Sequence, residues 1–441
     1  MTLIRIFTIL LLTFSICMAK FTDTLDLQTA LTFRIDSIKI TGNKITKDEV
    51  ILRELSIKPG DLINDRIIQY NKERIYSLGL FTFVRINPAV IKNSVQLIIQ
   101  VDESWYIWPV PFIDIRDNLI RKMSYGMDIQ YRNFRGMNET IGLRFALGYD
   151  PSLSLSYYRP WLIKAYDIAF FANFYYQRVL NKSAEAFYLY GSDFEHTILS
   201  GSLGIGKRFG LFHMLSVSTG FDYIETPKYL SPISASNERI DRIYKAGLGY
   251  VYDSRNLKQF PDSGIYSSAS YIQKGFGINN VSYSVMNLDF RHYFSIAGDL
   301  SLKWRLAARF AVGHKVPLYD YSFLGAGEKV RGHFNDIREG IDSYVGSIEM
   351  KYPLINEWDL SLKLPLIPRE LSSARIRIFT NLFYDGGAVR PKGKPVRAGD
   401  YYSGYGAGLL FLMLPYNLVR LEFAFDEQQK MEMILGFGFS F

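Results

Sequence analysis

Cysteine and histidine are scarce in this 441-residue chain, which holds one cysteine, Cys17, and five histidines. The residues after Cys17 can therefore form neither a disulfide with one another nor a thiolate metal site. The histidines show no metal-ligand spacing; they are His196, His213, His292, His314 and His333. No two carboxylates stand out as a general acid and base, and no glycine-rich phosphate loop follows a strand and opens a helix. We expect no enzymatic activity, no metal site and no cofactor.

Long apolar runs are also missing. Beyond the N-terminal residues no stretch of 18 or more apolar residues occurs, so the sequence predicts no transmembrane helix. Lysine and arginine outnumber aspartate and glutamate by 51 to 43, but they are scattered, which is typical of a solvated surface and not of a nucleic-acid-binding protein. Tyrosine, phenylalanine and glycine are abundant, at 31, 32 and 34 residues, and this mixture favours many strands with aromatic belts.

The first 19 residues have the pattern of a secretory signal peptide. Arg5 precedes an apolar run from Ile6 to Ile16, and Ala19 provides a small-residue exit. Cys17 as a lipid-anchor cysteine is the less favoured alternative, because the preceding Phe14-Ser15-Ile16 lacks the small residues such a site prefers. We expect a linker at residues 20–32.

Residues 33–104 predict a small α+β domain. Strands are expected at Phe33–Ile40, Phe81–Ile86 and Val95–Val101, and helices from Thr46 to Leu55 and from Asn64 to Leu78, with a turn from Pro88 to Asn93. Thr46 and Glu49 have the spacing of a capping box, and Gly79 ends the second helix. The order β-α-α-β-β leaves two functions open: a folded spacer, or a docking module whose edge strand accepts an extended peptide.

From residue 105 onward the sequence alternates with a period of two. Apolar Val419, Leu421 and Phe423, for example, alternate with Arg420 and Glu422. Sixteen strands are expected, at about 105–115, 123–133, 140–149, 152–160, 166–178, 196–208, 212–224, 243–253, 264–273, 282–294, 300–313, 344–353, 375–386, 402–413, 417–426 and 431–441. A soluble sandwich also alternates, but the strand length and the terminal aromatic residues favour an antiparallel transmembrane β-barrel.

One segment does not fit the strand pattern. Residues 319–341, YDYSFLGAGEKVRGHFNDIREGI, are too long and polar for a strand and too rich in glycine for a helix. A connection of this length is usually functional or disordered. If it folds into the barrel lumen, Arg331 requires a carboxylate, and the alternation from Arg375 to Asp385 directs Asp385 inward. Glu349 is a second candidate, and the alternative is an extracellular loop with a solvated arginine.

Several short motifs resemble those of the BamA/TamA family of outer-membrane proteins. In the N-terminal domain, which looks like a POTRA domain, they are Gly42-Asn43, Arg53-Glu54-Leu55, Gly60-Asp61 and Tyr76-Ser77-Leu78-Gly79-Leu80-Phe81. In the barrel they are Asn133-Phe134-Arg135-Gly136, Tyr158-Arg159-Pro160-Trp161, Asp253-Ser254-Arg255-Asn256 with Pro261 and Gly264, Val330-Arg331-Gly332-His333 and Phe383-Tyr384-Asp385-Gly386-Gly387. The likeness covers nearly all of residues 33–441.

This resemblance implies a function in the bacterial outer membrane, with the POTRA-like domain in the periplasm. It implies insertion of outer-membrane proteins or translocation of polypeptides, with client polypeptides, outer-membrane lipid and periplasmic accessory proteins as partners. A passive pore or lipid-handling barrel is the alternative, and an adhesin would need longer external loops than the one from Thr226 to Arg239. The presence of one POTRA-like domain leaves open whether the protein is a principal or an accessory assembly factor.

Two candidate sites follow. The first locks the loop to the barrel wall through Val330, Arg331, Gly332, His333, Asp385 and Glu349. The resemblance implies the same pairing of the loop arginine with the strand aspartate. His333 stands where the family has an aromatic residue, which predicts a pH-sensitive contact. The second site is a seam between the first and last strands, formed by Tyr106, Ile107, Phe437, Phe439 and Phe441.

Overall fold

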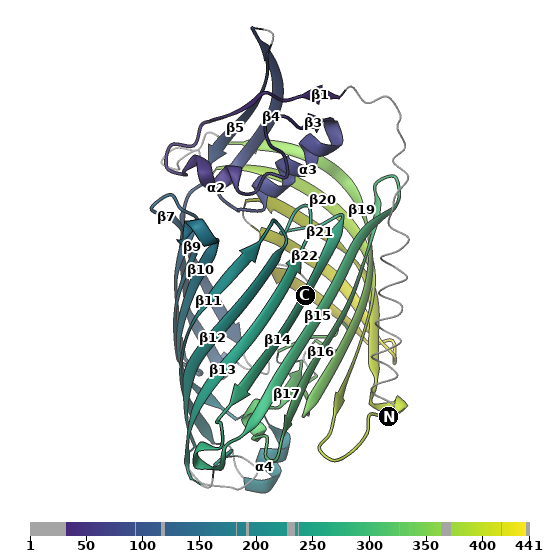
Figure 1. Cartoon of the computed structure of the whole chain (residues 1–441). Helices are drawn as coiled ribbons and strands as arrows, with labels where there is room; N and C mark the ends of the chain where they lie inside the picture. The colour runs from purple at the N-terminus through teal and green to yellow at the C-terminus, as the bar shows by residue number, and fades with distance from the viewer. Residues whose placement is uncertain are drawn as a thin grey trace.

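A small α+β domain covers one mouth of a sixteen-stranded β-barrel in the computed structural model of the chain (Figure 1). The structure describes residues 32–92, 94–115, 120–181, 183–190, 194–226, 234–236, 238–325, 327–334, 336–362, 372–415 and 417–437. The predicted signal peptide and most of the predicted linker lie outside these residues. No helix in the described ranges has the length and apolar character needed to cross a membrane.

The N-terminal domain contains a three-stranded sheet in the order β2-β5-β4, in which β2 is parallel to β5 and β4 is antiparallel to it. Two short strands, β1 and β3, form a separate antiparallel pair. The elements are β1 (Phe33–Arg34), β2 (Ser37–Thr41), α2 (Asp48–Leu52), β3 (Leu62–Ile63), α3 (Asp65–Tyr76), β4 (Phe81–Ile91) and β5 (Ser94–Glu103). The predicted α+β class is confirmed.

Two local predictions in this domain are wrong. Thr46 does not cap α2, because its buried hydroxyl lies 2.7 Å from Glu103 Oε1 and 3.0 Å from the Tyr106 hydroxyl, and the N-cap residue is Lys47. The turn expected from Pro88 is also absent, since β4 continues to Ile91. Proline is tolerated there because β4 is an edge strand of its sheet and has a neighbour on one side only.

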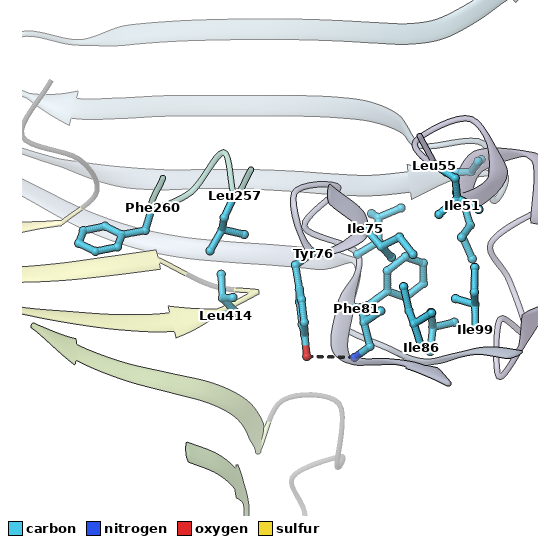
Figure 2. Close-up of a cluster of buried hydrophobic side chains, with 14 of the residues drawn as sticks. Ile51, Leu55, Ile75, Tyr76, Phe81, Ile86, Ile99, Leu257, Phe260 and Leu414 are labelled. Carbon is cyan, nitrogen blue, oxygen red and sulfur yellow. Dashed lines mark hydrogen bonds between the residues drawn. The ribbon is translucent and has the colours of Figure 1, made fainter. Parts of the chain in front are cut away.

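The second helix, α3, follows the sequence closely. The Asn64 side chain caps it by accepting a hydrogen bond from the Ile67 amide at 2.9 Å. Gly79 lies just beyond its C-terminal end with a φ of +69°, a conformation that glycine adopts without strain. Tyr76, in the last turn of α3, is buried and accepts a hydrogen bond from the Val84 amide at 3.0 Å (Figure 2). This contact fixes the helix on the sheet.

The barrel is a single antiparallel sheet in which neighbouring strands pair in chain order. Its strands are β6 (Ile107–Ile115), β7 (Met123–Phe134), β8 (Glu139–Gly148), β9 (Ser152–Ile163), β10 (Ile168–Leu180), β11 (Glu195–Phe209), β12 (His213–Glu225), β13 (Ile240–Asp253), β14 (Gly264–Lys274), β15 (Tyr283–Ala297), β16 (Leu300–Gly313), β19 (Asp342–Ser361), β20 (Ser373–Arg390), β21 (Tyr402–Leu414), β22 (Asn417–Asp426) and β23 (Met431–Phe437). The predicted number of sixteen strands is confirmed.

Outward-facing side chains of the barrel are apolar and exposed, as Leu203, Leu306 and Leu382 illustrate, each more than half exposed. Apolar side chains on the outer surface of a barrel are suited to lipid. The longest strands, β19 and β20, have 20 and 18 residues and extend beyond their predicted bounds. A short helix, α4 (Ala184–Tyr190), lies at the end of the barrel opposite the N-terminal domain (Figure 1).

The hydrophobic core of the N-terminal domain continues into the mouth of the barrel. Ile51 and Ile75 belong to the same buried cluster as Leu257, Phe260 and Leu414 of the barrel (Figure 2). Leu257 and Phe260 lie in the connection between β13 and β14, and the Phe260 and Phe379 ring centroids are 4.5 Å apart. The domain and the barrel are therefore joined by apolar packing as well as by the chain.

Candidate functional site

The connection between β16 and β19 is folded against the inner wall of the barrel. It contains two three-residue strands, β17 (Ser322–Leu324) and β18 (Arg338–Gly340), which pair with each other. The segment that looked too polar for a strand therefore forms a small hairpin. Beyond β17, Val330 is fully buried in a cluster with Leu324, Val345 and other apolar side chains. The alternative of a solvated loop arginine is therefore not what the structure contains.

Arg331 lies at the centre of this contact and is 2% exposed. Its Nε donates to Asp385 Oδ2 at 2.7 Å and its Nη2 donates to Oδ1 at 2.8 Å, a bidentate pairing. Its Nη1 donates to Glu349 and to Glu422, each at 2.8 Å. The guanidinium also lies 3.6 Å from the centroid of the Phe383 ring. Arg331 thus joins the loop to three barrel strands, β19, β20 and β22.

The carboxylates around Arg331 have further partners. Glu349 pairs with Lys303 at 3.2 Å, and Glu422 pairs with Arg420 at 2.9 Å. The Ser347 hydroxyl donates to Asp385 at 2.7 Å. Three cations and three carboxylates therefore form one cluster with no net charge: Arg331, Lys303, Arg420, Asp385, Glu349 and Glu422. Neutrality matters because an unpaired charge in a confined interior is costly.

The structure brings the predicted pair, Arg331 and Asp385, together, along with the second candidate, Glu349. Sequence reasoning did not select Glu422, which also contacts Arg331. The alternation of β22 gives a signal that could have found it, because Glu422 lies on the face opposite Leu421 and Phe423. Alternation gives the face of a residue, but the depth of Glu422 in the lumen depends on strand register.

Two glycines allow the loop to approach the wall closely. A Cβ atom at Gly404 would lie 1.8 Å from the Arg331 carbonyl oxygen, so only glycine fits at this position of β21. Gly332 has a φ of +93°, and a Cβ there would lie 2.9 Å from the Phe425 carbonyl oxygen. The glycine that follows the loop arginine therefore has a steric explanation in this chain.

His333 connects the loop to the turn between β22 and β23. Its Nδ1 lies 2.8 Å from Asp336 Oδ2, and its Nε2 lies 2.7 Å from Glu427 Oε2. A neutral imidazole has one N–H, so two carboxylate acceptors can both be satisfied only by the imidazolium. Burial opposes the charge, but the hydrogen bonds to Asp336 and Glu427 outweigh it and raise the pKa of His333. The Tyr402 ring packs edge-on against the imidazole at 4.9 Å.

The seam residues of the sequence prediction are placed as follows. Ile107 is the first residue of β6 and is 44% exposed. Tyr106 precedes β6, and its hydroxyl contacts Thr46 in the N-terminal domain. Phe437 is the last residue of β23, while Phe439 and Phe441 lie outside the described residues. In the described part of the chain, no strand pairing joins β6 to β23.

Three of the family-like barrel motifs, at residues 133–136, 158–161 and 253–256, contact the N-terminal domain. At the end of β7, the Asn133 side-chain amide donates to the Thr46 hydroxyl at 2.9 Å, and in the turn that follows the Gly136 carbonyl accepts from the Lys47 amide at 3.0 Å. A Cβ at Gly136 would lie 2.1 Å from the Ile45 carbonyl oxygen, so the glycine permits this docking.

Glu54 forms ion pairs at the same contact between the N-terminal domain and the barrel, and it is 8% exposed. Arg74 of its own domain pairs with it at 2.7 Å, and Arg208 of β11 pairs with it at 2.6 Å. Burial alone would raise the pKa of Glu54, but hydrogen bonding and charge attraction from Arg208 lower it to about 2. Sequence analysis identified Glu54 only as part of a motif, because nothing in the sequence indicates that it bridges two domains.

The described residues contain no group of three or more histidine, cysteine, aspartate or glutamate side chains that could hold a metal ion. Ion pairs hold the loop against the inner wall of the barrel and the N-terminal domain against the barrel mouth.

These features define a class of protein: an outer-membrane β-barrel that carries a periplasmic α+β domain and a lumen loop. The Omp85 superfamily domain matches residues 133–441, and a POTRA domain described as a surface antigen variable number repeat matches residues 33–104. The chain belongs to the Omp85 superfamily. Its barrel resides in the bacterial outer membrane with the POTRA domain in the periplasm, and the family consists of assembly and transport barrels without enzymatic activity.

Individual relatives are distant. A Treponema pallidum (strain Nichols) protein, named as a candidate outer membrane protein assembly factor, is 28% identical over 135 residues. This match covers 29% of the chain and 16% of the relative's length. BamA from Haemophilus ducreyi lacking POTRA domains 1–3 has a TM-score of 0.52 at 18% identity, over 91% of this chain and 83% of that one. CdiB from Escherichia coli has a TM-score of 0.54 at 10% identity, over 91% and 74%. Both structures show similarity of fold.

Proposed function

We propose that this protein inserts or translocates client polypeptides at the outer membrane through a seam between β6 and β23. The observation that carries the proposal is that these two strands end the sixteen-stranded sheet, each with a pairing neighbour on one side only in the described residues. An unpaired strand edge is a template for another extended chain. A client strand could pair there and leave sideways into the lipid.

The contents of the lumen support a route through the seam over one through the centre. The Arg331 cluster occupies part of the lumen beside β19, β20 and β22, and Phe260 lies 5% exposed in the mouth that the POTRA domain covers. A passive pore, the alternative function, would require an open lumen. These obstructions therefore favour an assembly or translocation function for the chain.

The two sides of the seam are held by different parts of the molecule, which further supports the proposal. On one side, the Tyr106 hydroxyl ties the start of β6 to Thr46 of the POTRA domain. On the other side, the loop contacts β22 through Glu422 and β23 through Glu432, whose Oε2 accepts from the Phe334 amide at 3.1 Å. A movement of the POTRA domain would therefore act on β6, while the loop holds the strands opposite.

The POTRA domain supplies a first docking surface for clients in this proposal. Strand β2 is an edge of the domain's sheet and pairs with β5 alone in the described residues. Its side chains are half-buried or exposed, so an extended client segment could add to it by β-augmentation. Outer-membrane lipid and periplasmic accessory proteins are the other proposed partners.

The test is depletion of the protein in its own cell, followed by quantitative proteomics of the outer membrane. The proposal expects a selective loss of integrated or exported client proteins, restored by the wild-type gene. In parallel, the purified barrel is placed in a planar bilayer. Unchanged outer-membrane protein levels together with a large, steady conductance would instead support the pore.

A further inference from the structure

A cavity of about 250 Å³ lies between the POTRA domain and the periplasmic turns of the barrel. Its charged lining residues are Arg53, Arg208, Lys258, Glu54 and Asp253. Aromatic side chains, among them those of Trp161 and Phe212, complete the wall. A water molecule takes about 30 Å³ of liquid volume, so the cavity has room for a group several times larger than water.

Positive charge exceeds negative charge around this cavity. Three further residues pair directly with the lining groups: Arg74 with Glu54, Arg255 with Asp253 and Asp167 with Arg53. With these partners included, five cations surround the cavity against three carboxylates: Arg53, Arg74, Arg208, Arg255 and Lys258 against Glu54, Asp253 and Asp167. The surplus of two positive charges contrasts with the neutral cluster around Arg331.

Two of the cations have N–H donors without an acceptor among the described residues. Lys258 is an exposed residue of the connection between β13 and β14 that lines the cavity, and its ammonium has no ion pair within 4.0 Å in the described part of the chain. The Nε atom of Arg53 is buried without an acceptor, while the rest of its guanidinium contacts Asp167 and the Trp161 ring. A buried donor without an acceptor is costly, and a ligand could satisfy it.

We propose that this cavity binds a phosphate-class dianion, held by Lys258 with Arg53 and Arg208. The surplus charge matches a doubly charged group, and guanidinium and ammonium groups are the side chains that hold phosphate. Arg53 lies at the C-terminal end of α2, Arg208 on β11 and Lys258 in the connection between β13 and β14. A bound dianion therefore joins the POTRA domain to two parts of the barrel mouth. This site is separate from the seam and from the loop contact of the proposed function.

The test measures binding of inorganic phosphate to the full-length detergent-solubilised protein by isothermal titration calorimetry at constant ionic strength, with chloride as the comparison anion. We expect saturable binding of one phosphate and little heat with chloride. Lys258→Gln is expected to weaken binding about tenfold, and Lys258→Arg to retain it. Lys58→Gln is the matched control, because Lys58 is an exposed lysine of the POTRA domain that does not line the cavity.

A second arm separates two sources of the phosphate group. Micelles containing a short-chain lipid with a phosphomonoester headgroup are titrated in the presence and absence of inorganic phosphate. Competition between the two assigns the site to a lipid headgroup, and binding of inorganic phosphate alone assigns it to a soluble anion. No saturable phosphate binding by the wild-type protein, or equal affinity in Lys258→Gln and Lys58→Gln, would overturn the proposal.

Discussion

Removing the Arg331 side chain should release the lumen loop while leaving the barrel strands paired. In Arg331→Ala, Glu349 keeps Lys303 and Glu422 keeps Arg420, but in the described part of the chain Asp385 retains only neutral partners, the Ser347 hydroxyl and the backbone amide of residue 331. The cluster changes from neutral to a net charge of −1. Breaking a buried ion pair from one side costs about 3–5 kcal/mol. We expect the free energy of loop opening to fall by about 3 kcal/mol, which is more than a hundredfold in the opening equilibrium.

The assay is hydrogen exchange of the amides in residues 327–334, measured on the protein in detergent micelles. Exchange through local opening reports the opening free energy of this segment, separately from the stability of the barrel. Arg178→Ala is the control, because Arg178 forms an exposed ion pair with Glu195 at 2.5 Å and such pairs contribute about 0–1 kcal/mol. Exchange in the loop should be the same in this control as in the wild type.

Asp385→Ala gives a second estimate of the same contact. It removes the acceptor of three buried Arg331 donors, two in the guanidinium and one in the backbone, and each buried donor left without a partner costs about 1–3 kcal/mol. In the double variant neither charge remains unpaired, so its loss should be smaller than the sum of the two single losses by about 0.5–3 kcal/mol. A double variant as destabilised as the sum of the singles would refute direct pairing.

Three further predictions concern the loop and the barrel mouth. Protection of the loop amides from hydrogen exchange should be complete below the ordinary imidazole pKa and should decrease as the pH rises through the raised pKa of His333. Measured between about pH 5 and 9, His333→Phe should lack this pH dependence. An unchanged pH profile in the variant would contradict the prediction. Gly404→Ala should displace the loop, because the new Cβ meets the Arg331 carbonyl oxygen, whereas Gly399→Ala, with no atom nearby, should match the wild type in loop exchange. Phe260→Ala should destabilise the packing at the mouth by about 3 kcal/mol in denaturant unfolding, and a loss under 1 kcal/mol would argue against a shared core.

The strands could be predicted from the sequence because lipid and lumen impose opposite chemistry on alternate residues. The pattern of Val419, Leu421 and Phe423 against Arg420 and Glu422 therefore located β22 without any knowledge of its neighbours. The hairpin of β17 and β18 could not be found in this way, since strands of three residues are too short to show a period.

The contacts that hold the parts together depend on tertiary structure. Glu422 and Arg331 are 91 positions apart in the sequence. They meet because the register of the strands places Glu422 at the same height in the lumen as the loop. Thr46 has the sequence of a helix cap, but its hydroxyl contacts Glu103 on β5 and Tyr106 before β6 instead. The local preference of a polar side chain for capping a helix is overridden where tertiary contacts satisfy that side chain.

A chemical staple across the seam is the most direct test of the proposed function. Ile107→Cys and Phe437→Cys are joined by a flexible thiol-reactive linker, and Tyr405→Cys with Phe425→Cys provides a control staple between strands that are already paired. Client insertion into proteoliposomes is then measured, with heat-dependent gel migration as the check on barrel folding. We expect the seam staple to abolish insertion and the control staple to leave it intact. Normal insertion by a folded, seam-stapled barrel would contradict a route through the seam.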